Sequence, residues 1–78
     1  MQAIEVTARW GADGEVTPVQ FRLEGSPIQV ETIGRRWQDE RGLHVLVKAQ
    51  GGQTYELAFS PVALKWFLSF QGASPRYI

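Results

Sequence analysis

PVQFRLEGSPIQVETIGRRW, residues Pro18–Trp37, is the stretch that decides the fold class of this chain. Apolar and polar residues alternate from Val19 to Leu23, which is the period of a half-buried β-strand. Turn-forming residues follow at positions 24–27, and a second alternating run begins at Ile28. The stretch therefore predicts a β-hairpin.

The second arm of this hairpin changes phase. Val30 and Ile33 are both large and apolar, but their odd spacing would put them on opposite faces of a flat strand. A β-bulge near residues 31–32 adds one residue and returns both side chains to the same face. Such a bulge bends the strand, as happens at the corners of small barrels. Arg35 and Trp37 are then expected on the face of Ile33.

Four further segments are strand-like, and turn residues separate them. They lie at about residues 4–10, 43–49, 55–59 and 62–70. The last segment has two readings, because Leu64, Trp66 and Leu68 alternate as in a strand, whereas Leu64, Phe67 and Leu68 share one face of a helix. We favour the strand, since its aromatic residues suit a sheet.

Successive short strands with turns between them predict an all-β protein. We expect a small antiparallel meander of about six strands, curled into an SH3-like barrel that buries its apolar face. Residues 1–71 form this single domain, and residues 72–78 form a short C-terminal tail. The predicted core consists of Ile4, Val6, Trp10, Val19, Phe21, Leu23, Ile28, Val30, Ile33, Leu43, Val45, Val47, Tyr55, Leu57, Phe59, Trp66 and Leu68.

The composition narrows the class of protein. The 78 residues include no cysteine, which excludes disulfides and thiolate metal sites and favours a cytoplasmic protein. Eight basic and eight acidic residues give zero net charge, so charge alone indicates neither nucleic acid nor a membrane surface as a partner. No apolar run reaches the length of a transmembrane helix, and we expect no signal peptide.

The spacing of apolar and turn residues resembles a family of small bacterial β-domains of unknown function. The matching patterns are P-x-x-F-x-L-x-G at residues 18–25, V-x-x-I-x-x-x-W at 30–37, Y-E-L at 55–57 and W-F-L at 66–68. The resemblance covers about residues 15–70. Leu23 replaces a usual aromatic residue, and Glu24 replaces a usual basic one. Members of the family often lie beside DNA-repair polymerase functions, which implies a nucleic-acid context but assigns no activity.

Catalysis and metal binding have little support in the sequence. His44 is the only histidine, and its strand position predicts a solvent-facing ring with no carboxylate placed to orient it. A nucleophile needs a base within hydrogen-bond reach, and zinc needs several histidine or cysteine ligands. We therefore expect no catalytic residue, no metal and no cofactor.

One candidate binding site is a basic and aromatic cluster. Arg35, Arg36 and Trp37 follow the expected bulge, and Lys48 lies on the next strand. With Arg9 and Arg22 these residues are suited to stacking bases and pairing with phosphates. The alternative places Trp37 in the core and the arginines in ion pairs with strand carboxylates. Zero net charge favours that alternative, so nucleic acid is the second of our two functional hypotheses.

The other candidate site is an apolar patch. Leu46 and Phe67 are expected to point outward, and His44 and Lys65 lie beside them. Exposed apolar patches mark contacts with other proteins or with a second copy of the chain. Our first hypothesis is therefore a non-catalytic protein-interaction or accessory module, with a protein partner or a homodimer and without membrane association.

Overall fold

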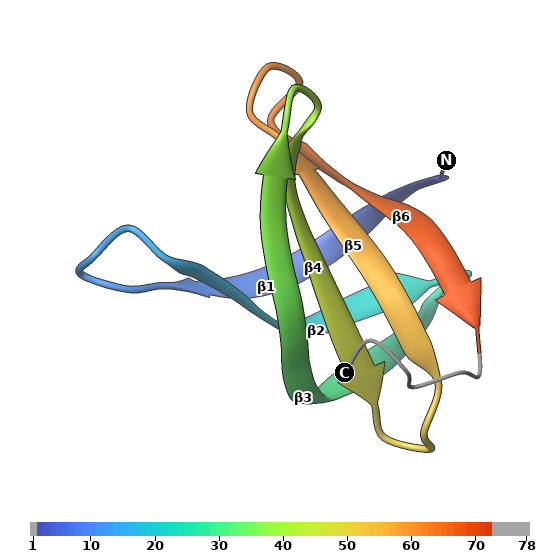
Figure 1. Ribbon diagram of the computed structural model, residues 1–78. Coiled ribbons are helices and arrows are strands. Elements are labelled where there is room, and N and C mark those ends of the chain that lie inside the picture. The colour runs from blue at the N-terminus through green and yellow to red at the C-terminus, as the bar shows by residue number, and fades with distance from the viewer. Residues whose placement is uncertain (1, 73–78) are drawn as a thin grey trace.

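The computed structural model of the protein describes residues 2–72, apart from the side chains of residues 70 and 71. Six antiparallel strands close into a small barrel in chain order (Figure 1). The strands are β1 (Gln2–Trp10), β2 (Val16–Leu23), β3 (Ser26–Asp39), β4 (Gly42–Ala49), β5 (Thr54–Ser60) and β6 (Lys65–Gly72). The all-β meander predicted from the sequence is confirmed. Of the expected tail at 72–78, only Gly72 lies within the described residues, and it ends β6.

Two strands change partners, which lets the sheet close. Residues 2–4 of β1 pair with β6, and residues 5–10 pair with β2. Residues 26–29 of β3 pair with β2, and residues 30–39 pair with β4. Figure 1 shows β3 bending sharply between these two halves. The register slips between Val30 and Thr32, as predicted, and again between Ile33 and Arg36.

A further bulge lies in β2. Thr7 pairs with Gln20 and the next residue, Ala8, pairs with Pro18, so Val19 is the extra residue. A bulge is one of the few places inside a sheet where proline is tolerated. The bulge turns Pro18 into the core and leaves Val19 half-buried. The expectation of a core Val19 was therefore wrong.

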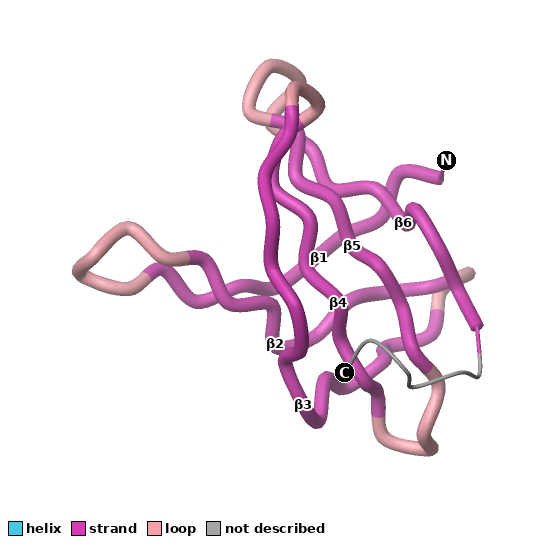
Figure 2. The backbone as a smooth tube through the Cα atoms, in the orientation of Figure 1, coloured by secondary structure: helices cyan, strands magenta, loops and turns pink. Residues whose placement is uncertain are grey.

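The core lies inside the barrel, on the inner face of the closed sheet. Its buried side chains belong to Val16, Phe21, Val45, Val47, Ala49, Tyr55, Leu57, Trp66 and Leu68. Trp10, expected in this core, is instead 62% exposed. The reason is that the end of β1 and the start of β2 extend away from the rest of the barrel as a two-stranded arm (Figure 2). A ring near the end of this arm has protein on one side only.

The ambiguous segment at 62–70 is a strand from Lys65 onward. Residues 61–64 form a turn, in which the Leu64 amide donates a hydrogen bond to the Ser60 carbonyl over 2.8 Å. Leu64 has a φ of 55°, and its side chain is 75% exposed. The strand reading is confirmed, but the strand begins one residue after Leu64.

Candidate functional site

The outer face of the barrel brings together residues from four strands. Trp37 on β3 lies opposite His44 on β4, His44 lies opposite Ala58 on β5, and Ala58 lies opposite Phe67 on β6. Directly opposite residues share a face of the sheet. Two members of the predicted protein-contact set, His44 and Phe67, are thus separated only by the intervening strand β5.

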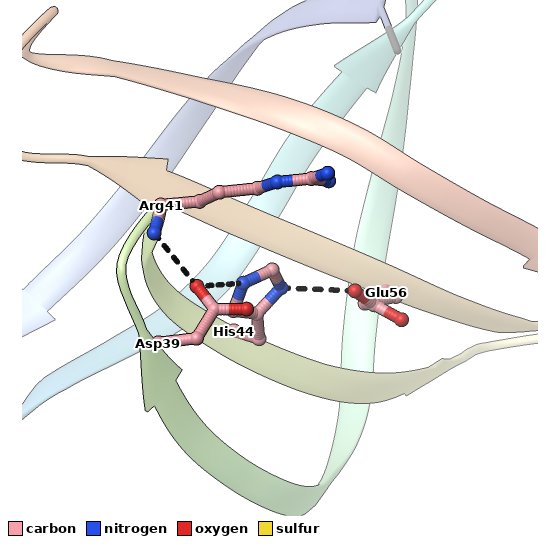
Figure 3. A network of polar contacts seen from close by, with 4 residues as sticks. All are labelled: Asp39, Arg41, His44 and Glu56. Carbon is pink, nitrogen blue, oxygen red and sulfur yellow. Dashed lines mark hydrogen bonds and ion pairs between the residues drawn. The ribbon is translucent and has the colours of Figure 1, made fainter.

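His44 is not the solvent-facing residue expected from the sequence. It is 4% exposed, and both ring nitrogens contact carboxylates (Figure 3). Nδ1 lies 2.9 Å from an oxygen of Glu56, and Nε2 lies 3.0 Å from an oxygen of Asp39. Glu56 is diagonal to His44 across the β4–β5 pair, and Asp39 lies across the β3–β4 turn. The expectation that no carboxylate orients this ring was therefore wrong.

The charges of this network are arranged to support one another. Carboxylate oxygens accept hydrogen bonds, so the ring satisfies both contacts when each nitrogen carries a proton. The Arg41 amide donates to Asp39 over 2.9 Å. This amide first, and His44 second, lower the pKa of the Asp39 carboxyl below its ordinary value. Asp39 is thereby held as the ionised acceptor of the β3–β4 turn.

Two further side chains stack outward from His44. The Trp37 ring lies parallel to the imidazole, with centroids 5.1 Å apart and an interplanar angle of 5°. The Arg35 guanidinium lies 5.6 Å from the Trp37 ring centroid, within the range of a cation–π contact. Because both nitrogens of His44 contact carboxylates, neither is available to bind a ligand. Within residues 2–72, no three histidine or carboxylate side chains are arranged so that they could hold a metal ion.

The predicted protein-contact patch does not form as expected. Leu46 is only 4% exposed, which contradicts its proposed role in an exposed patch. Phe67 is half-buried and Lys65 is exposed. Phe67 contributes, with His44 and Ala58, to a shallow hollow of about 310 Å³ next to the β3–β4 and β5–β6 turns.

The predicted nucleic-acid set is divided between two surfaces. Arg35 and Trp37 lie on the outer face, whereas Arg36 is directed toward the arm. Arg36 donates hydrogen bonds to the Val16 carbonyl and, over 3.1 Å, to the Thr17 hydroxyl. Neighbouring residues of a strand point to opposite faces, so Arg36 is separated from Arg35 and Trp37. The second slip of β3 decides which face each takes, because it places Arg36 opposite the core residue Val45 and Trp37 opposite His44.

The remaining basic residues do not join Arg35 in one groove. Arg22 is 3.9 Å from Glu5 and donates to the Gly25 carbonyl over 2.9 Å, both on the outside of the β1–β2–β3 part of the barrel. Lys48 is half-buried near the far end of β4. The structure therefore does not gather Arg35, Arg36, Trp37 and Lys48 on one surface, and a nucleic-acid role for these residues stays a prediction.

One concave surface of the described residues is a cleft that the sequence analysis did not predict. We call it the Trp10 cleft, with a volume of about 480 Å³, between the arm and the ends of β3, β4 and β5. Its lining consists of Trp10, Gly14, Glu15, Val16, Arg36, Gln38, Asp39, Gly42, Leu43, Phe59 and Pro61. The Trp10 and Phe59 rings meet edge to face with centroids 6.2 Å apart.

Arg36 joins the two walls of the cleft. Its hydrogen bonds reach β2, and its Nε lies 3.8 Å from an oxygen of Glu15. These contacts hold the arm at a fixed distance from β3. The sequence signal that could have indicated the cleft is Trp10, a large ring at the last position of a strand, immediately before Gly11, although we expected it in the core.

Comparison of the chain with models of protein families, with curated proteins and with solved structures finds no match. Among residues 2–72 there is no helix with the length and apolar character needed to cross a membrane.

Proposed function

We propose that this protein is a non-catalytic interaction module that binds an extended segment of a partner protein in the Trp10 cleft. The observation that carries the proposal is the 62% exposure of Trp10 beside a cleft with an aromatic wall. Tryptophan is costly to leave in water and is enriched among the residues that dominate binding energy. The cleft volume of about 480 Å³ falls within the range of sites that bind ligands.

The lining favours a particular kind of segment. Trp10, Leu43 and Phe59 offer an apolar surface for one aliphatic or proline side chain. Glu15 and Asp39 also line the cleft, and although Glu15 is paired with Arg36 and Asp39 with His44, their carboxylate side chains remain 57% and 45% exposed. The cation of Arg36 is less exposed and is engaged by Glu15 and β2. A segment with an apolar residue next to a basic one therefore suits the cleft. We also propose that the barrel binds this segment in an SH3-like manner and that the protein is cytoplasmic.

Selection from a random peptide library, followed by NMR titration of the chosen peptide, tests this proposal. We expect the largest shifts at the Trp10 indole and at Leu43 and Phe59. Trp10→Ala should weaken binding about 30-fold or more, as at a typical hot spot. Leu64→Ala, which removes another exposed apolar side chain away from the cleft, should leave binding unchanged. Equal effects of the two variants would contradict the proposal.

A nucleic-acid interface is the second candidate, and the stack of Arg35 on Trp37 supports it. This pair can receive one unpaired base, and the family resemblance points in the same direction. Titration of labelled single-stranded DNA and RNA at low and moderate salt tests the idea. Binding that falls steeply with salt and is lost in Trp37→Ala supports it. Binding absent at low salt removes it.

A further inference from the structure

Among the described residues, nothing pairs with one edge of β1 over most of its length. Within residues 2–72, β6 pairs only with residues 2–4 of β1, while residues 5–10 are paired with β2 alone. The extra residue of the bulge in this ribbon lies in β2, so β1 itself continues without interruption. An unpaired strand edge presents backbone donors and acceptors that a further strand can satisfy.

The sequence of this edge is complementary to itself. Residues 5–9 read Glu-Val-Thr-Ala-Arg. Antiparallel pairing of two copies about Thr7 places Glu5 opposite Arg9 of the second copy, and Val6 opposite Ala8. Opposite charges in directly facing positions stabilise a strand pair, and like charges destabilise it. Such a dimer contains two Glu5–Arg9 pairs, one on each side of the symmetry axis.

Arg9 is available for this contact. It is exposed, its neighbour across the β1–β2 pair is the uncharged Thr17, and it forms no ion pair with any described residue. Glu5 also remains largely exposed, although Arg22 approaches it at 3.9 Å. Zero net charge means that two copies approach without overall repulsion.

The surface beside the edge has room for an incoming strand. A hollow of about 450 Å³ lies where β1 separates from β6, lined by residues 3–6 and 64–66. Leu64, which is 75% exposed, forms part of this hollow. A second β1 strand that ends here would cover Leu64, so pairing would bury apolar surface as well as backbone groups.

We propose that two copies of this protein associate through antiparallel pairing of residues 5–9 of β1 about a two-fold axis at Thr7. None of residues 5–9 lines the Trp10 cleft, so the dimer is proposed independently of peptide binding. One short strand pair buries little area, and we expect association in the high micromolar to millimolar range.

Single-cysteine variants test the predicted alignment directly, because the natural chain has no cysteine. Facing Cα atoms in an antiparallel pair lie about 4.5–5.5 Å apart, which a disulfide can span. Thr7→Cys should therefore form a covalent dimer in a glutathione redox buffer. Thr32→Cys is the matched control, since Thr32 is also an exposed strand threonine but lies on β3. Equal cross-linking of the two variants would overturn the proposal.

Charge exchange provides an independent test without cross-linking. Glu5→Arg and Arg9→Glu should each weaken self-association roughly tenfold, because each places like charges opposite one another at two positions. A mixture of the two variants restores opposite charges, so it should form a heterodimer about as tightly as the natural protein forms its dimer. Sedimentation equilibrium at rising concentration measures all three cases, and circular dichroism confirms that the variants are folded.

Two results would overturn the proposal regardless of the cross-linking data. One is a natural protein that remains monomeric at millimolar concentration. The other is a dimer whose affinity is the same for both single variants and for their mixture, because such a dimer must use another surface.

Discussion

Gly42 shows how one residue sets the geometry of the β3–β4 turn. Its φ is 135°, and a Cβ at this position would lie 2.0 Å from the Phe59 carbonyl oxygen. Gly51, in the β4–β5 turn, also has a positive φ of 100°, but a Cβ there would meet nothing. Gly42→Ala combines backbone strain with overlap, whereas Gly51→Ala brings strain alone. We expect Gly42→Ala to reduce the free energy of unfolding by about 2 kcal/mol more than Gly51→Ala.

Urea denaturation of both variants measures this difference. Because Gly42 follows the turn that holds Asp39 and Arg41, the Gly42→Ala variant should also shift the NMR signals of His44. Similar losses of stability in the two variants would show that the close approach of β4 to Phe59 is easily relaxed.

At the scale of the elements, the polar network joins the β3–β4 turn to β5 and makes stability depend on pH. The pKa of Asp39 is lower in the folded protein than its ordinary value of 3.8. The ionised carboxylate therefore favours the folded state, and its contribution is complete well above that value and is lost as the pH falls through the folded pKa. Asp39→Asn should destabilise the protein at neutral pH and have a smaller effect at about pH 3.

Unfolding by urea at several pH values measures this dependence. Glu40→Gln is the matched control, because it removes the neighbouring carboxylate but none of the bonds to His44. If both variants changed stability equally at every pH, the network would not be the source of the pH dependence.

The bend of β3 was readable in the sequence, and the side-chain network beside it was not. The odd spacing of Val30 and Ile33 required a bulge, because two buried apolar residues must share a face. The second slip was missed because Ile33, Arg35 and Trp37 alternate as in a regular strand, whereas the structure places Arg36 opposite Val45 and Trp37 opposite His44. The contacts of His44 depend on the pairing of β4 with β5, which places Glu56 nearby. Local periodicity predicts strands, whereas such contacts require the register between strands.

At the scale of the whole molecule, the barrel is closed by its shortest strand pair. Only residues 2–4 of β1 meet β6, whereas β4 and β5 pair over six residues each around the fully buried Val45 and Leu57. Short pairing with half-buried side chains opens at a lower free energy than a long central pair. We expect backbone amides at this β1–β6 seam to exchange with solvent faster than those of β4 and β5.

Ile4→Ala distinguishes local opening of the seam from cooperative unfolding of the barrel. Ile4 is half-buried and lies opposite Trp66, so its truncation removes apolar contacts at the seam. If the seam opens by itself, hydrogen exchange in Ile4→Ala accelerates at residues 2–4 and 66–68 while the slowest amides of β4 and β5 change much less. If all amides accelerate by the same factor, closure and the central strands form one cooperative unit. That result would mean that the three pairs of the seam contribute directly to global stability, as a closed barrel of this size without disulfides would require.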